Sequence, residues 1–293
     1  MKFKAPLLVA ATTLIASPAI AQSDLAEVEI KAEEVTPGIA VLFGAGGNIG
    51  VSYGDGGTIL IDDQFAPLTE KIEAAVTDLG ATPVKFLVNT HWHYDHTGGN
   101  ENFGKRGALI FAHDNVRARM LNGGTVAGTA TSPAPAEALP IVTYGQGLSF
   151  HANGDTVDVI FLGGGHTDGD SIIRWRESNV VHMGDLYFNI PGYPFIDTSS
   201  GGNAVNAMNS LDSALRLMDN ETKVIPGHGP MSNKAELVAY RVMIGQAVTN
   251  VRALKDSGKT LEETVAAKPL AGFDRGEGFI GPDAFVTAIY NSL

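Results

Sequence analysis

His91-Trp92-His93-Tyr94-Asp95-His96 is the stretch that decides the fold, because it places four potential metal ligands within six residues. It follows an alternating, β-branched run over 84–90, which predicts a strand. Histidines at i and i+2 in an extended chain point to the same side, so His91 and His93 can share one ion. Asp95 and His96 lie where the chain turns, and they remain free for a second ion. The spacing therefore predicts a two-metal site at a strand end.

The rest of the chain supplies further ligand-type residues at the ends of predicted strands. Three of them follow the predicted strands over 156–162, 180–183 and 223–226, and these are His166, Asp185 and His228. The glycines before His166 are no dinucleotide fingerprint, since no G-x-G-x-x-G opens a helix there. The remaining histidines stand outside this pattern, and we expect structural roles for all three: His113, His151 and His182.

Strand and helix patterns alternate along the chain and predict an α/β protein. Short β-rich runs with glycine turns over 28–63 predict an antiparallel meander. Helical spacing predicts helices over 67–79, 114–121, 203–218, 232–256 and 282–293. Two long loops are expected at 122–139 and 186–202, the first as a surface loop that forms a mobile wall of the site. No linker divides residues 22–293, so we predict a single domain there.

Residues 1–21 have the pattern of a secretory signal. A basic start precedes an apolar run over 7–16, and Ala19-Ile20-Ala21 fits a cleavage site before Gln22. A membrane anchor is the alternative, but it needs about 20 apolar residues, and Pro18 interrupts this run too early. We therefore expect a periplasmic or secreted protein without a stable membrane anchor.

Composition restricts the possible partners. The chain has 20 basic residues, 32 acidic residues and no cysteine. Loss of the two lysines in residues 1–21 would leave 18 basic residues and a formal charge of −14. This charge argues against a nucleic-acid partner, because phosphate binding needs a basic surface. Without cysteine the chain has no disulfide, no thiolate ligand and no cysteine nucleophile. The sequence carries no signal of an oligomeric state.

Taken in order, these motifs resemble those of the metallo-β-lactamase superfamily. The resemblance runs from about Val28 to the end of the chain and rests on four elements. These are His91-x-His93-x-Asp95-His96, a histidine in a glycine-rich turn, an aspartate after a strand, and a final Gly-His-Gly. It implies an αββα sandwich, in which two mixed β-sheets lie back to back with helices outside and a metal site along one edge.

The resemblance also implies which residues bind the metal ions. It implies two sets joined by a bridging Asp185: His91, His93 and His166 on one zinc ion, and Asp95, His96 and His228 on another. Neutral imidazoles and carboxylates suit zinc, although iron or manganese would accept the same donors. A water shared by two such ions becomes a hydroxide near neutral pH. We expect that hydroxide to attack an acyl bond, while Asp95 acts as the catalytic residue that holds it and passes on its proton.

Three further residues are candidates for supporting roles. Asp62 ends a strand, where the family often has an acid that hydrogen-bonds a ligand histidine, although a helix-capping aspartate is the alternative. Tyr94 and Asn203 are candidate donors to a developing oxyanion. For these two we favour simpler roles, a tyrosine that packs in a loop and an asparagine that caps a helix.

Fold and ligands do not fix the substrate. Asp185 stands where many zinc β-lactamases have a cysteine, Phe188 replaces a lysine that anchors the β-lactam carboxylate, and the turn over 44–47 is too short and polar for a hydrophobic flap. These differences favour the thioesterase and lactonase branches. In contrast, the export signal and the stretch over 195–203 resemble exported lactamase-type hydrolases.

We therefore expect an exported hydrolase with two zinc ions, broad specificity for small acyl compounds and at least weak β-lactamase activity. A lactone, ester, thioester or phosphoester hydrolase is the alternative. An iron protein of the persulfide dioxygenase type is an alternative of another class, but those relatives use one iron, and this chain retains Asp95, His96 and His228. A nuclease is disfavoured by the acidic charge.

Overall fold

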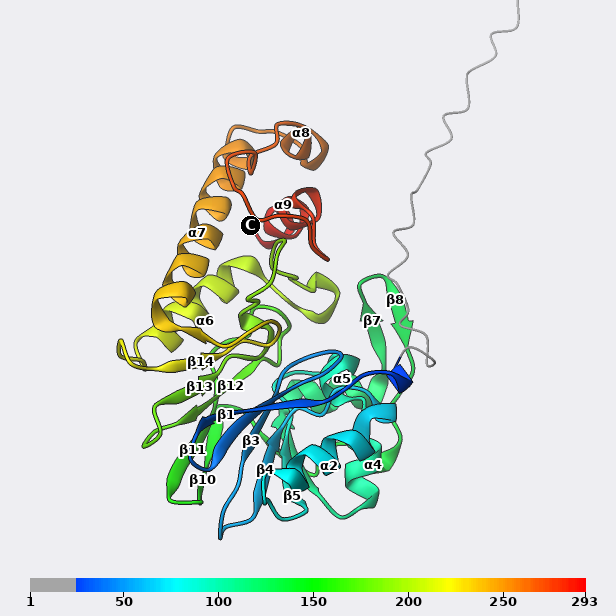
Figure 1. Cartoon of the computed structure of the whole chain (residues 1–293). Helices are drawn as coiled ribbons and strands as arrows, with labels where there is room; N and C mark the ends of the chain where they lie inside the picture. The colour runs from blue at the N-terminus through cyan, green and yellow to red at the C-terminus, as the bar shows by residue number, and fades with distance from the viewer. Residues whose placement is uncertain (1–24) are drawn as a thin grey trace, which may run out of the picture.

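The computed structural model describes residues 25–293, so the predicted signal over 1–21 lies outside the described residues. Two large β-sheets form its framework (Figure 1). The first sheet contains β1 (Lys31–Thr36), β2 (Ile39–Phe43), β3 (Ile49–Ser52), β4 (Thr58–Ile61), β5 (Val84–Val88), β6 (Leu109–His113) and β9 (Val142–Tyr144), in that order. The second contains β10 (Gly147–Ala152), β11 (Asp155–Phe161), β12 (Ser171–Trp175), β13 (Val180–His182), β14 (Lys223–Ile225) and β15 (Ser232–Asn233).

Both sheets are mixed, as predicted. In the first sheet, β1 to β4 form the expected antiparallel meander, and β4, β5, β6 and β9 run parallel to one another. In the second sheet, β13 and β14 are parallel and the other neighbours are antiparallel. The helices on the outer faces include α2 (Thr69–Asp78), α4 (Asn100–Lys105), α6 (Ala204–Leu215), α7 (Lys234–Asp256) and α9 (Pro282–Ser292).

Alternating side chains divide the core into layers. On β4, Ile59 and Ile61 point into the cluster between the two sheets, whereas Leu60 points into the cluster under α2. The inner cluster also contains Val159 and Ile173 of the second sheet. The outer face of the second sheet is covered by α6, α7 and α9 in a third cluster (Figure 1). This order of layers is the expected αββα sandwich, which is thereby confirmed.

The parallel strands deliver side chains to one edge of the sandwich. Strands β4 and β5 run parallel and end just before Asp62 and His91. Strands β13 and β14 also run parallel and end just before Asp185 and His228. Because parallel strands end on the same side of a sheet, residues far apart in the sequence meet at this edge.

Several details of the secondary structure differ from the sequence-based expectations. The loop over 122–139 contains a hairpin of β7 (Gly124–Val126) and β8 (Thr129–Thr131), whose strands are only three residues long. The hairpin touches the second long loop, since Ser199 Oγ donates to the Thr125 carbonyl at 2.7 Å. A helix, α8 (Leu261–Ala266), was not predicted. The helix α5 (Asp114–Asn122) begins one residue after its cap, since His113 is the N-cap and its side chain accepts from Asn115 N.

Among residues 25–293, no helix combines the length and the apolarity needed to cross a bilayer.

Candidate metal centre

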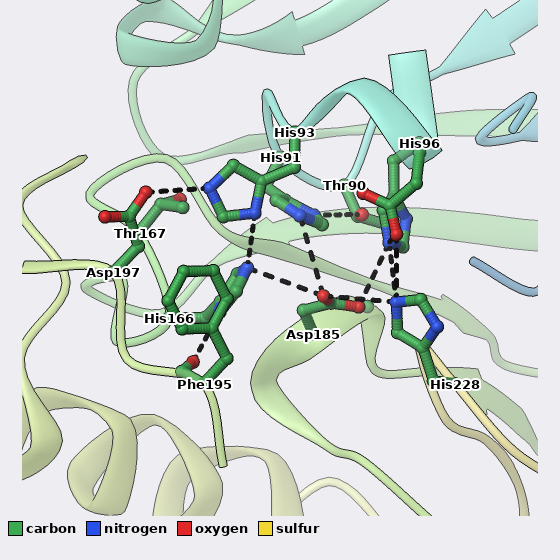
Figure 2. A network of polar contacts seen from close by, with 12 residues as sticks. Thr90, His91, His93, His96, His166, Thr167, Asp185, Phe195, Asp197 and His228 are labelled. Atoms are coloured by element: carbon green, nitrogen blue, oxygen red, sulfur yellow. Dashed lines mark hydrogen bonds and ion pairs between the residues drawn. The ribbon is translucent and has the colours of Figure 1, made fainter. Parts of the chain in front are cut away.

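Seven side chains converge at this edge, and they are the seven that the resemblance implied (Figure 2). They form two groups, each with ligand atoms within 4.8 Å of one another: His91, His93, His166 and Asp185, and then Asp95, His96 and His228. Asp185 connects the groups, because its Oδ2 lies 3.4 Å from Nε2 of both His166 and His228. Its Oδ1 lies 3.1 Å from His96 Nε2. The geometry therefore has the two-group arrangement with a shared carboxylate that the motif predicts.

Asp62 orients one histidine of each group. It lies directly after β4 with a φ of 63°, a left-handed conformation that aspartate tolerates better than most residues. Its Oδ2 accepts hydrogen bonds from His96 Nδ1 and from the Thr90 hydroxyl, both at 2.7 Å. Since the Thr90 hydroxyl donates to Asp62, it accepts from His91 Nδ1 at 3.0 Å. Asp62 thus has the predicted place behind a ligand histidine and caps no helix.

The other two histidines of the first group are held from the 186–202 loop. His93 Nε2 donates to Asp197 Oδ2 at 2.9 Å, and His166 Nδ1 donates to the Phe195 carbonyl at 2.6 Å. The other nitrogens of these two imidazoles, His93 Nδ1 and His166 Nε2, face each other at 2.8 Å (Figure 2). Fixing the outer nitrogen in this way selects the tautomer that a metal ligand requires.

Burial and nearby charges shift the pKa values of the histidines in opposite directions in the two groups. Burial lowers the pKa of His91 well below its usual range and that of His166 to about 4, so both are neutral at pH 7. For His96 and His228, burial acts in the same direction, but nearby carboxylates outweigh it. Asp185 and Asp95 raise the pKa of His96 well above its usual range and that of His228 to about 9. Without metal, the second group therefore carries positive charge beside Asp185.

The donor set of the first group fits a divalent metal. Within the part of the chain that the structure describes, His91 Nε2 is buried and has no hydrogen-bond partner. It lies in the same group as the facing ring nitrogens of His93 and His166. Several buried imidazole nitrogens that converge in this way are the arrangement that a bound cation stabilises. Imidazole and carboxylate donors suit zinc, and they also accept iron or manganese.

The two groups differ in their access to solvent. The side chains of the first group are at most 5% exposed, whereas those of Asp95 and His228 are 30% and 21% exposed. The turn over 44–47 packs against His96 and against the backbone of Asp95. Gly47 N donates to the Asp95 carbonyl at 3.1 Å, and the Gly47 carbonyl accepts from Gln64 Nε2 at 2.7 Å. The open approach to the centre therefore lies beside Asp95 and His228.

Asn203 does not face the ligands, which corrects its candidacy as a substrate contact. Its Oδ1 accepts from the backbone amides of Val205 and Asn206, and its Nδ2 donates to the Ser292 carbonyl at 3.2 Å. These bonds make it the N-cap of α6, a role that contributes about 1 kcal/mol to helix stability. Tyr94 is 60% exposed and packs against the Phe65 ring at 5.7 Å, in the packing role that we favoured.

Two of the three histidines outside the motif, His113 and His182, have backbone partners. His182 Nε2 donates to the Asn48 carbonyl at 3.0 Å, and its Nδ1 accepts from Gly184 N at 3.1 Å. His113 Nδ1 accepts from Asn115 N at 3.2 Å, as part of the cap of α5. His151 is exposed on β10. The expected structural roles hold for His113 and His182.

Asp197 is the supporting residue that sequence reasoning missed. Beyond His93, it accepts hydrogen bonds from the hydroxyls of Ser199 and Ser200 and from Ser199 N at 3.1 Å. These donors hold the pKa of the carboxyl at about 2 although burial acts to raise it, so Asp197 is ionised. A carboxylate with two serines close behind it, within the 195–203 stretch, is the sequence signal for such a residue.

Asp197→Asn is expected to weaken binding of the first metal about 10- to 100-fold, because the charge that polarises His93 is lost while the shape is kept. Competition with a chromophoric chelator measures this affinity. The control is Asp212→Asn, which breaks an ion pair with Arg241 at 2.6 Å between α6 and α7. Equal affinities in the two variants would count against a positioning role for Asp197.

Metal binding to the second group should depend on pH, and binding to the first group should not. His228 has a pKa of about 9 in the metal-free protein and must lose its proton to bind a metal. Affinity for the second ion should therefore rise from pH 6.5 to pH 9, by about tenfold per pH unit for each proton released. The first group provides the internal control, since His91 and His166 are already neutral over this range.

Calorimetric titrations in buffers of different ionisation enthalpy measure the protons released. An affinity for the second ion that does not change with pH would contradict this prediction.

An αββα sandwich that gathers histidines and carboxylates at one sheet edge is typical of metal-dependent hydrolases. The profile of the family described as the metallo-beta-lactamase superfamily matches residues 43–228, which is more than half of the chain. The protein therefore belongs to the metallo-β-lactamase superfamily. All seven ligand-type residues of the two groups lie within the matched segment.

Three curated relatives share parts of the sequence. A hydroxyacylglutathione hydrolase of Rhodospirillum rubrum is 30% identical over 176 residues, which are 59% of this chain and 57% of that protein. The probable metallo-hydrolase YqgX of Bacillus subtilis is 28% identical over 187 residues, 59% of this chain and 83% of that protein. The 2,4-dinitroanisole O-demethylase subunit alpha of a Nocardioides strain is 26% identical over 148 residues, 49% of this chain. The match spans only 42% of that subunit.

Solved structures share the fold. A metallo-β-lactamase from Pontibacter korlensis superposes with a TM-score of 0.63 at 19% identity, over 74% of this chain and 99% of that one. The inverting sec-alkylsulfatase Pisa1 from a Pseudomonas species superposes with a TM-score of 0.68 at 17% identity, over 89% of this chain and 50% of that one. At these identities the likeness concerns the fold alone.

Proposed function

We propose that this protein is an exported zinc hydrolase that opens acyl bonds in small molecules, with two zinc ions per chain. The observation that carries the proposal is the pair of ligand groups joined by Asp185. One ion would be held by His91, His93 and His166, and the other ion would be held by Asp95, His96 and His228. Asp185 would contact both ions. Such a pair, when bound, lowers the pKa of a water and polarises the scissile group.

Asp95 is the residue proposed to move protons. Its Oδ2 lies 3.3 Å from His228 Nε2, and nearby histidines hold its pKa well below the usual range although burial acts to raise it. An ionised and partly exposed carboxylate accepts a proton from the attacking water and delivers it to the leaving atom. Burial lowers the pKa of His91 and of His166, so both imidazoles are neutral at pH 7 and can serve as metal ligands there.

The proposed substrate range includes β-lactams, at least with weak activity, beside esters, lactones and thioesters. The family match and the β-lactamases of the same fold support the first part. The second part is favoured by Asp185 in place of a cysteine and by similarity to a hydroxyacylglutathione hydrolase. The proposed partner is a small acyl compound and not a nucleic acid, because the chain carries a formal charge of −12.

An iron-dependent redox enzyme is the rival function. A single-iron site needs only the first group of ligands, whereas here Asp95, His96 and His228 also lie within 4.8 Å of one another. The complete second group therefore favours hydrolysis.

Export through the predicted signal over 1–21 is part of the proposal. N-terminal sequencing of the protein recovered from the periplasm or medium should begin at Gln22. Recovery of an uncleaved chain from the cytoplasm would contradict this localisation.

A substrate panel tests the function. We expect the zinc-loaded protein to turn over nitrocefin slowly and at least one of a lactone, a thioester and an aryl ester more rapidly. His93→Ala serves as the control, because it removes a ligand of the first group. Nitrocefin turnover no faster than in His93→Ala would remove the β-lactamase part. Equal rates of the two proteins on the whole panel, including an aryl phosphate, would overturn the proposed function.

A further inference from the structure

Two phenylalanine rings pack against histidines of the metal centre from the side of the 186–202 loop. The Phe195 ring stacks on His93, with centroids 5.7 Å apart and an angle of 21°, and lies edge-on to His166 at 5.3 Å (Figure 2). The Phe188 ring stacks on His228 at 5.5 Å and 7°, and lies edge-on to His166 at 5.7 Å. Both phenylalanines are half-buried, so part of each ring remains accessible. The centre is therefore bordered by apolar surface on the side of the 186–202 loop.

Phe279 extends this surface outward. Its ring lies edge-on to Phe195 at 5.7 Å and 87°, yet it is 60% exposed. An exposed phenylalanine by itself is unremarkable on a protein surface. Here it continues a chain of rings that begins on the ligand His93, so its exposed face lies two aromatic contacts from the metal centre.

Backbone contacts hold Phe279 in place. The amide of Tyr193 donates to the Ile280 carbonyl at 3.0 Å, and the amide of Gly192 donates to the Arg275 carbonyl at 2.7 Å. The Arg275 guanidinium donates back to the Gly192 carbonyl at 3.0 Å. The segment over 275–280 is thus bound to the loop that carries Phe195, which presents a positioned ring at low entropic cost.

The position of this segment in the sequence also bears on its role. Residues 275–280 lie beyond the family match, which ends at residue 228. The ligand groups belong to the matched segment, whereas Phe279, the outermost ring of this apolar surface, comes from the C-terminal part of the chain beyond the match. Such an element is suited to select substrates without changing the chemistry.

We propose that Phe279, backed by Phe195, binds an aryl or extended alkyl substituent of the substrate, so that the enzyme prefers acyl compounds with such a group. This inference rests on the proposed acyl-hydrolase function and names its substrate class. Aromatic rings supply apolar contact area and edge or face contacts to a second ring. Phe279 is thus a specificity-determining residue that touches the substrate away from the reacting atoms.

Two pairs of substrates test this proposal. One pair differs only in the acyl chain, 4-nitrophenyl acetate against 4-nitrophenyl phenylacetate, and the other only in the leaving thiol, S-methyl against S-benzyl thioacetate. In Phe279→Ala, kcat/KM for the larger member of at least one pair should fall about tenfold, with the smaller member within about twofold. Phe279→Leu should keep most of the preference. The control Val242→Ala, at a valine of α7 that is 46% exposed, should change neither member.

A binding experiment separates this proposal from the proposed function. Calorimetric titration of the zinc-loaded protein with acetate and with phenylacetate needs no turnover. Tighter binding of phenylacetate that is lost in Phe279→Ala supports the aromatic site even if no substrate in the panel is hydrolysed. Equal effects of Phe279→Ala on both members of both pairs, together with unchanged phenylacetate affinity, would overturn the proposal. A changed oligomeric state with an unchanged substrate preference would overturn it as well.

Discussion

Asp185→Asn should lower kcat/KM by roughly 100-fold or more and should lower occupancy of the second metal, because one carboxylate serves both ligand groups. Asp185 Oδ2 lies 3.4 Å from histidines of each group. Although burial acts to raise its pKa, His228, His96 and His91 hold it well below the usual range. Asparagine has the same shape, but it removes the negative charge that faces both sites. The expected loss is therefore electrostatic and leaves the fold intact.

Elemental analysis and steady-state kinetics on the same preparation measure both effects. Asp158→Asn is the matched control, since Asp158 is also buried and pairs with Arg176 at 2.6 Å on the second sheet. It should keep the wild-type metal content. Unchanged second-metal content in Asp185→Asn would show that Asp185 does not bridge the two groups.

Gly47→Ala should disable the second group by a steric route. A Cβ at position 47 would lie 2.1 Å from the His96 ring. The ring cannot move away without breaking its 2.7 Å hydrogen bond to Asp62. The backbone cannot move either, because Gly47 is tied to Asp95 and to Gln64. One methyl group must therefore displace a ligand.

We expect Gly47→Ala to weaken the second metal about 10- to 100-fold while the first metal is retained. Stepwise zinc titration with a competing chelator resolves the two affinities. Gly272→Ala is the control, since a Cβ there meets nothing within 4 Å. Wild-type affinity for the second metal in Gly47→Ala would contradict the packing of this turn on His96.

The ligand groups and the layers were predictable because their signals are local. Ligand spacing in His91-x-His93-x-Asp95-His96 depends on strand geometry, and His166, Asp185 and His228 each follow a recognisable strand. The αββα order follows from alternation such as that of Ile59, Leu60 and Ile61, whose sides of the sheet are fixed by the pleat.

The residues that were missed depend on long-range contacts. Asp197 lies 104 positions after His93 in the sequence, and the residues next to Asp197 do not indicate that His93 is its hydrogen-bond partner. Phe279 joins Phe195 only because the segment over 275–280 returns to the 186–202 loop. The hairpin over 124–131 has no clear sequence signal, because strands of three residues are too short to show an alternation of apolar and polar side chains. Asn203 was a local prediction instead, since its Oδ1 caps its own helix and its Nδ2 donates to the Ser292 carbonyl.

The metal content of the purified wild-type protein tests the central claim most directly. Elemental analysis of protein expressed in medium that contains both zinc and iron counts the ions and identifies them. We predict about two zinc ions per chain and no stoichiometric iron, because two nitrogen and oxygen ligand groups share Asp185. One iron per chain with no second metal would contradict a dinuclear zinc hydrolase.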